Sequence, residues 1–444
     1  MTRYAVVGAG IAGLASAWEL TRVAPDAEIT VFDPGPLGGK LRTSRFAGRL
    51  VDEGADAFLA RVPWGRDLCD ELGLGSELVS PATGAAYLAR GNDLVALPPG
   101  LVLGVPTDAA ALAGSPLLSA EAVDRVRAEP SLPGSPLAVD DDPSVGALVR
   151  ARFGDEILER LVDPLVGGIN AGDSDRLSVR AAVPQIADAA ARSASLVEGL
   201  RAAPPSAPGP VFWAHPQGMA AIVGRLVDAL RDADVRFEPV AVDDLGDVDA
   251  SGGIVVATPA PAASKLLGPA GALDAARVLG GIGHSSPVLV TLALRRDDVG
   301  HPLDASGFLV PRTEGRLLTA CSFATTKWQQ LDTDAATVVL RASAGRYGDD
   351  AANAMTDHTV VDRLLAELDA LLGLRGAPTE VRVSRWPDGF PQYEPGHLSR
   401  VAAIEADVAA TVPHVRLAGA TYRGVGIPAC IRSGRDAARD LVDR

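Results

Sequence analysis

Hydrophobic residues near the start of the chain follow first a strand pattern and then a helix pattern. Residues 4–7 form a short apolar run, and residues 11–22 place apolar side chains at helical spacing. The stretch AEITVFD then predicts a second strand that ends at Asp33. The chain therefore opens with a strand, a helix and a strand.

Further along, the pattern divides the chain into three kinds of segment. Residues 107–204 have helical spacing with little strand signal, and the proline-rich stretch APPSAPGP after them is interpreted as a linker. The strand and helix pattern returns in GMAAIVGRLVDALRDADVRFEPV, in GGIVVATPAPAASKLL and at the C-terminus. Residues 281–391 instead alternate as antiparallel strands do, with one helix near VVDRLLAELDALLGL. We predict an α/β domain interrupted by a helical insert, and a second domain built on a mixed sheet.

Composition and charge exclude several classes of function. The 444 residues, 47% of them hydrophobic, are enough for two or more cored domains, and the net charge of -15 without a Lys/Arg run argues against nucleic-acid binding. Cys69, Cys321 and Cys430 lie far apart, which predicts a reducing cytoplasm with neither disulfides nor a metal site. The apolar windows are too short to span a bilayer, although peripheral membrane contact stays open.

A glycine turn follows the first strand. Gly8, Gly10 and Gly13 have G-x-G-x-x-G spacing, which lets backbone approach a pyrophosphate, and Asp33 is placed to accept hydrogen bonds from a ribose. An ordinary tight turn is the alternative. The pair Gly38-Gly39 with Lys40 soon after the acid favours an FAD enzyme of the glutathione-reductase type over a nicotinamide enzyme.

Longer motifs occur along nearly the whole chain: GAGIAGL, GGKLRT, EGADAFLAR, ALPPGLVLGVPT, RFGDEILERLVDPLVGGINAGD, HPQGM, RWPDGFPQYEPGH and LAGATYRGVGIPACIRSG. With these motifs the sequence resembles the flavin-dependent porphyrinogen oxidases of haem biosynthesis. It is most similar to the coproporphyrin-forming coproporphyrinogen III oxidases of Gram-positive bacteria, in the protoporphyrinogen oxidase superfamily. The departures are Val62 for a basic residue, Asn170 for an aromatic, Ala429 for Asp and Asp33 for Glu.

The resemblance implies an α/β fold of amine-oxidase type with three domains. An FAD-binding, Rossmann-like domain would comprise residues 1–60, 223–275 and 400–444. A mixed-sheet substrate domain would comprise residues 61–106, 205–222 and 276–399. A helical domain, related to membrane-binding ones, would comprise residues 107–204.

Carried over residue by residue, the resemblance also implies the contacts of FAD. The glycine turn would lie at the pyrophosphate, Asp33 at the ribose, Val240 at the adenine, and the loop before the last helix at the isoalloxazine ring. The expected cofactor-binding residues are Gly8, Ala9, Gly10, Ile11, Ala12, Gly13, Asp33, Pro34, Lys40, Gly54, Ala55, Asp56, Ala57, Val240, Trp386, Val425, Gly426 and Ile427. Pro428 suits the first turn of that helix, whose N-terminus would stabilise the anionic reduced flavin. We interpret Cys430 as a packed side chain rather than a nucleophile.

The implied reaction is a six-electron oxidation of coproporphyrinogen III to coproporphyrin III, with hydride passing to flavin N5 and O2 giving three hydrogen peroxide. No catalytic side chain is expected, because the cofactor carries the chemistry. Four propionates call for basic groups, with Arg61 as first candidate and a surface arginine as its alternative. Weaker candidates are Asn170, Lys327, Arg346, Tyr393 and His397; a histidine in a Gly-His turn is more often a structural hydrogen-bond partner.

Other functions stay open. Protoporphyrinogen IX is the nearest rival substrate, with fewer basic groups expected around it. An FAD amine oxidase or desaturase is more distant, since 4% aromatic residues leave little material for an aromatic cage. A flavin-containing regulator or scaffold without turnover is a further alternative. A ferrochelatase is a conceivable transient partner that would receive the product.

Overall fold

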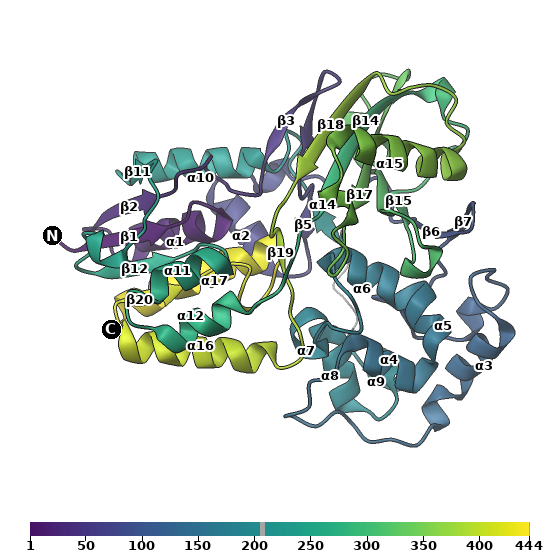
Figure 1. The fold of residues 1–444 in the computed structure, drawn as a ribbon, viewed down its shortest axis with the longest axis horizontal. Helices are drawn as coiled ribbons and strands as arrows, with labels where there is room; N and C mark the ends of the chain where they lie inside the picture. Colours follow the sequence, from purple (N-terminus) through teal and green to yellow (C-terminus); the bar gives the residue numbers. More distant parts are fainter. Residues whose placement is uncertain (205–208, 444) are drawn as a thin grey trace.

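The computed structural model describes residues 1–204 and 209–443. Three bodies of structure lie side by side: a parallel sheet with its helices, which holds both chain ends, a mixed sheet, and a group of helices below the mixed sheet (Figure 1). This arrangement confirms the predicted fold class. Residues 205–208 of the predicted linker lie outside the described residues.

The first body is a five-stranded parallel sheet assembled from three distant segments of the chain. The strand order is β11-β2-β1-β12-β20. Val6 pairs with Val31 on one side and with Val255 on the other, so the first strand lies in the centre. The strands are β1 (Arg3–Val7), β2 (Glu28–Phe32), β11 (Arg236–Glu238), β12 (Gly253–Val256) and β20 (Val415–Leu417).

Helices cover both faces of this sheet, because the strand residues that point to either face are apolar. Val6 packs with α1 (Ile11–Val23), α10 (Ala220–Asp232) and α17 (Ile427–Val442), and Ala5 and Val7 pack with the helices of the other face. The other face carries α11 (Ala260–Leu267), α12 (Leu273–Gly280) and α16 (His397–Thr411). The last of these helices has no counterpart in the sequence prediction.

The second body is a seven-stranded mixed sheet of order β18-β14-β17-β16-β15-β6-β7. Neighbours are antiparallel except β6 and β15, which are parallel. Helix α15 (Asp357–Leu372) shares its core. The strands are β6 (Tyr87–Arg90), β7 (Asp93–Ala96), β14 (Val288–Arg295), β15 (Gly307–Leu309), β16 (Leu318–Phe323), β17 (Thr337–Ala344) and β18 (Glu380–Arg385).

The third body consists of helices joined by loops within residues 107–204, which agrees with the helical pattern of the sequence. Its core is formed by the apolar faces of its longer helices. A buried carboxylate, Glu129, is stabilised inside it by Arg152 at 2.7 Å and Ser195 at 2.6 Å. The helices are α3 (Ala120–Ala128), α4 (Val145–Phe153), α5 (Asp155–Ile157), α6 (Asp163–Asn170), α7 (Val179–Ala182), α8 (Pro184–Arg192) and α9 (Leu196–Arg201), with a π-helical turn at Leu158–Val162.

Short elements connect the three bodies. Helix α2 (Pro63–Glu71) packs into the core of the parallel sheet through Leu68 and Cys69, although residues 61–106 were assigned to the substrate domain. The exact domain boundaries stay predictions. The other elements are β3 (Thr43–Phe46), β4 (Arg49–Asp52), β5 (Phe58–Leu59), β8 (Leu101–Val102), β9 (Val105–Pro106), β10 (Phe212–Trp213), β13 (His284–Ser285), β19 (Phe390–Pro391), α13 (Ala324–Lys327) and α14 (Ala351–Ala354).

The three cysteines are free and buried. Burial raises the pKa of Cys69 and of Cys430 to about 12, so both thiols are protonated near neutral pH. In the part of the chain that the structure describes, no helix combines the length and the apolar character needed to cross a bilayer.

Candidate flavin and substrate site

A cavity of about 760 Å³ runs from the carboxyl edge of the parallel sheet to the space between the mixed sheet and α6. Its lining comes from segments far apart in the sequence. The first part is formed by the turn after β1, the end of β2, residues 241–243 and α11; the second by residues 38–41, 54–55, 386–391 and 419–430; the third by α6 and the mixed sheet. A single cavity therefore extends along all three bodies.

The glycine turn closes tightly at the first part of the cavity. A Cβ at Gly13 would lie 1.8 Å from the carbonyl oxygen of Gly8, so only glycine lets α1 approach β1 this closely. A Cβ at Gly10 would meet no described atom within 4 Å, and Gly10 lines the cavity. The first N–H groups of α1, capped by a glycine without a side chain, therefore face a cradle open to an anion.

Asp33 follows β2 and holds this turn in place. Its Oδ2 accepts from the Ala9 N–H at 2.6 Å, and its Oδ1 accepts from the Gly35 N–H at 2.7 Å. A carboxylate oxygen has two acceptor sites, so each oxygen keeps capacity for a ribose hydroxyl. Asp33 and Pro34 both line the cavity.

Lys40 follows the glycine pair and reaches toward the second part of the cavity. Its Nζ donates to the Gly389 carbonyl oxygen. Enclosure by the protein lowers the pKa of Lys40, and nearby Cys430 and Asp388 oppose that shift. A negatively charged ligand would favour the protonated ammonium here.

The glycine-rich loop before α17 also lines the second part, at residues 419–421 and at Val425. Tyr393 and His397 hold this loop from behind. The Tyr393 hydroxyl donates to the Ala420 carbonyl and accepts from the Gly424 N–H at 2.9 Å, and His397 Nε2 lies 2.9 Å from the Tyr422 carbonyl oxygen. The two rings stack with centroids 4.0 Å apart. The sequence motifs PQYEPGH and TYRGVGIP are therefore two halves of one buried assembly.

Helix α17 begins at Ile427 with Gly426 as its cap and Pro428 in its first turn. Ile427 and Cys430 line the cavity, so the N-terminus of α17 opens onto it as the N-terminus of α1 does. The two helices pack against each other, and a Cβ at Gly434 would lie 2.1 Å from the Ala12 carbonyl oxygen. Two helix dipoles thus favour negative charge in one cavity.

The third part of the cavity has a wall of glycines and small groups of charged and hydroxyl side chains. Gly167, Gly168 and Gly172 line it from α6 and the turn after it, and Thr319 and Ser343 line it from the mixed sheet. The two hydroxyl oxygens are 2.9 Å apart. A Cβ at Gly168 would have only Leu309 within 4 Å, at 3.5 Å, so α6 contributes little side-chain bulk to the lining at this position.

Asp163 and Arg346 are the charged residues that line this third part. Asp163 Oδ1 accepts from the Ser174 N–H at 3.2 Å, and its Oδ2 lies 3.9 Å from Nε of Arg312. Arg346 donates to the Val310 carbonyl at 2.5 Å and forms no ion pair with a described residue. Burial and the neighbouring Arg312 lower the pKa of Arg346, so a carboxylate ligand would relieve both effects.

Of the predicted cofactor residues, the structure brings twelve together at the cavity: Gly8, Gly10, Ile11, Ala12, Asp33, Pro34, Lys40, Gly54, Ala55, Trp386, Val425 and Ile427. Ala9, Gly13 and Gly426 are neighbours of these residues in the sequence and are not part of the lining. Val240 is 49% exposed, and the lining residues beside it are 241–243. Asp56 and Ala57 lie outside the lining.

Most of the predicted substrate residues lie outside the cavity lining. Arg61 is exposed in the turn before α2, and Lys327 is paired with Asp56 at 3.1 Å. Asn170 is buried, with its Nδ2 donating to the Val166 carbonyl at 2.9 Å. Tyr393 is 2% exposed behind the loop. Of the substrate candidates, only Arg346 lines the cavity, and the roles of the others stay predictions.

Several cavity residues escaped the sequence reasoning. Asp163 was the acid of the VDPLVGGI motif, and Arg312, which lies 3.9 Å from it outside the lining, was in a strand connection, so nothing local connected them. His284 and Asp388 are brought to the lining by β13 and the turn before β19. The acidic residue before a proline in a glycine-rich helix was the one signal that could have indicated Asp163.

A nucleotide cradle on a parallel sheet, joined to a chamber against a mixed sheet, defines a dinucleotide-dependent oxidoreductase. The model of the flavin-containing amine oxidoreductase family matches residues 11–442, and the chain belongs to this family. The residues fit FAD, since the open cradle, Asp33 and the two helix N-termini offer donors and acceptors for its phosphates and ribose. FAD is the cofactor.

Relatives agree with the predicted resemblance. The chain is 36% identical to the coproporphyrinogen III oxidase of Mycobacterium leprae and 30% identical to that of Staphylococcus aureus, each across 99% of this chain and 98% of the relative. A crystal structure from Exiguobacterium sp. 255-15, provisionally assigned as a protoporphyrinogen oxidase, has 30% identity and a TM-score of 0.88 over 100% of this chain and 99% of that one. The predicted resemblance is confirmed.

Proposed function

We propose that the protein oxidises coproporphyrinogen III to coproporphyrin III in haem biosynthesis, with O2 as the final electron acceptor. The observation that carries the proposal is the third part of the cavity, a glycine-walled chamber continuous with the flavin part. The full-length similarity to enzymes named coproporphyrinogen III oxidase supports this choice of substrate.

Bound FAD supplies a two-electron acceptor at N5, so six electrons leave the macrocycle in three turns and O2 carries them away as three hydrogen peroxide. The residues of the chain contribute by positioning the cofactor and by the electrostatic field around it. The glycine turn and Asp33 would hold the nucleotide, and residues 419–421 and Val425, which line the cavity, would contact the ring system. The N-terminus of α17 stabilises negative charge that builds up beside it.

At the substrate end, Arg346 binds a propionate, and Arg312 supports it from the chamber's edge. Asp163 accepts a hydrogen bond from a pyrrole N–H and so orients the macrocycle. Gly167 and Gly168 let the macrocycle lie close to α6. The unpaired guanidinium of Arg346 gains a charge-assisted hydrogen bond on binding, which a substrate without carboxylates could not supply.

A second candidate substrate is protoporphyrinogen IX, which has two propionates in place of four. The cavity lining has fewer cations than anions, which favours a substrate with fewer carboxylates. Its cations are Lys40, Lys265 and Arg346, and its anions are Asp33, Asp163, Asp243 and Asp388. Only one of the three cations lines the chamber beside α6.

Porphyrin fluorescence on the purified, FAD-loaded protein tests the proposal. We expect kcat/KM to be higher for coproporphyrinogen III than for protoporphyrinogen IX, with hydrogen peroxide formed alongside each porphyrin. A higher kcat/KM for protoporphyrinogen IX would reject the substrate assignment. The absence of porphyrin and peroxide with both substrates would favour a regulator or scaffold.

A further inference from the structure

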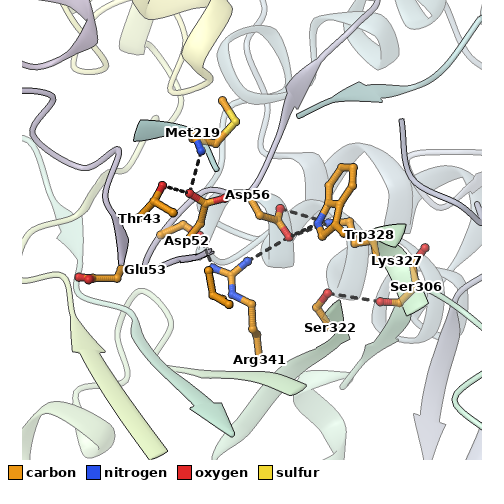
Figure 2. A network of polar contacts seen from close by, with 12 residues as sticks. Thr43, Asp52, Glu53, Asp56, Met219, Ser306, Ser322, Lys327, Trp328 and Arg341 are labelled. Carbon is orange, nitrogen blue, oxygen red and sulfur yellow. Dashed lines mark hydrogen bonds and ion pairs between the residues drawn. The ribbon is translucent and has the colours of Figure 1, made fainter. Parts of the chain in front are cut away.

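A group of charged residues lies behind the turn at residues 53–55, of which Gly54 and Ala55 line the flavin part of the cavity. Arg341 is buried in this group, and Asp56 and Lys327 are each 19% exposed. The Asp56 carboxylate accepts hydrogen bonds from Lys327 Nζ and from the Trp328 indole, and it forms an ion pair with Arg341 (Figure 2). Burial would raise the pKa of Asp56, but the two cations more than offset this and hold it well below its usual range. The carboxylate is therefore a permanent anion beneath the turn.

Arg341 differs from Lys327 in also contacting the backbone of the turn. Its Nη1 lies 3.0 Å from Asp56 Oδ2, while its Nη2 donates to the carbonyl oxygen of Gly54. Among the described residues, no other side chain donates to that carbonyl. Because the guanidinium is planar and carries several donors in a fixed arrangement, the ion pair with Asp56 also fixes its direction toward Gly54.

The contact with Gly54 sets the orientation of one peptide. In a trans peptide the C=O of one residue and the N–H of the next point in opposite directions. With the Gly54 carbonyl held by Arg341 behind the turn, the Ala55 N–H points away from Arg341, and Ala55 lines the cavity. Within residues 1–204 and 209–443, the Ala55 N–H donates to no atom of the chain.

The neighbouring peptides are held as well. The Trp386 indole donates to the Glu53 carbonyl at 3.0 Å, and the Glu53 N–H donates to the Arg42 carbonyl at 2.8 Å. A Cβ at Gly54 would lie 3.0 Å from the Lys40 carbonyl oxygen and 3.3 Å from the Trp386 ring. The turn thus has little room to rotate, and the Ala55 N–H is left as an unpaired donor at a residue that lines the cavity.

We propose that Arg341 is a positioning residue for the flavin: it orients the peptide between Gly54 and Ala55 so that the Ala55 N–H donates to an acceptor atom at the edge of the isoalloxazine ring. Asp56 acts through Arg341 by fixing its direction. The mixed sheet, which carries Arg341 on β17, thereby tunes a cofactor bound mainly by the parallel sheet. The proposal concerns the flavin alone and does not depend on which substrate is oxidised.

The test compares Arg341→Met with Lys327→Met in the FAD-loaded protein. Each variant removes one cation from Asp56, but only Arg341→Met frees the Gly54 carbonyl. We expect the Kd of FAD to rise about tenfold in Arg341→Met, the factor that corresponds to one lost hydrogen bond, and less than about threefold in Lys327→Met. The flavin midpoint potential should become more negative in Arg341→Met only, because a donor to the electron-rich reduced ring is lost.

Arg341→Lys provides a second variant that keeps the charge, should Arg341→Met not fold by circular dichroism. A lysine ammonium lacks the planar arrangement that serves Asp56 and Gly54 together, so Kd and potential should shift in the same direction. The proposal is overturned if the two methionine variants have the same Kd and potential. It is equally overturned if the folded Arg341 variant keeps the flavin spectrum, Kd and potential of the unaltered protein.

Discussion

Replacing Tyr393 with Phe removes a single oxygen atom from behind the flavin loop. That oxygen donates to the Ala420 carbonyl and accepts from the Gly424 N–H, in a side chain of which 2% is exposed. A buried backbone donor or acceptor left unpaired costs about 1–3 kcal/mol, so the two together should lower the free energy of unfolding by about 2–6 kcal/mol. The loop lines the cavity, and part of this loss should therefore fall on FAD binding.

Two measurements check this prediction. The temperature of FAD release should fall, and the Kd of FAD should rise about tenfold, which corresponds to about 1.4 kcal/mol. Tyr347→Phe is the matched control, because its hydroxyl contacts Arg176 and Glu394 near the surface and not the loop. An unchanged FAD affinity with a raised substrate KM in Tyr393→Phe would refute the structural role and favour direct contact with substrate.

Three further predictions concern Gly13, His397 and Arg346. Gly13→Ala should abolish FAD binding, measured by retention on a desalting column, because the new Cβ would lie 1.8 Å from a backbone oxygen, whereas Gly224→Ala, where the Cβ meets open space, should retain it. Burial lowers the pKa of His397 from 6.5 to about 4, so the unfolded state binds the proton first as the pH falls. The neutral histidine therefore contributes about 3 kcal/mol of stability above pH 6.5, and this contribution should be lost between pH 6.5 and 4. The pH-dependent melting of His397→Gln should lack this loss. Arg346→Gln should raise the KM for coproporphyrinogen III about tenfold with little change in FAD affinity, and an unchanged KM would remove Arg346 from the substrate site. Arg61→Ala, measured in the same assay, should raise the KM only if Arg61 contacts the substrate.

The fold was predictable where short-range patterns carry it. The glycine turn, the acid after β2 and the apolar runs identify the parallel sheet, and helical spacing identifies residues 107–204, because both depend on neighbours within one element. Helix α16 was missed although it fills one face of the sheet, since its start at His397 lies inside a motif read for chemistry rather than for spacing.

The site was predictable only where one local turn builds it. Contacts made through long-range packing could not be predicted: Lys327 was proposed as a substrate cation, and the structure shows it paired with Asp56, which is 271 residues away. Tyr393 and the loop it holds are 27 residues apart, and Arg341 is an arginine in an ordinary strand pattern. Pairing partners of buried charges depend on topology, which hydrophobic spacing does not encode.

Anaerobic mixing of coproporphyrinogen III with the FAD-loaded protein tests the central claim most directly. The flavin absorbance should bleach as porphyrin fluorescence appears, at one porphyrin for about three flavins reduced, because six electrons leave the macrocycle two at a time. Admission of O2 should restore the oxidised flavin and release hydrogen peroxide. A flavin that stays oxidised in the presence of excess coproporphyrinogen III would contradict the proposed function.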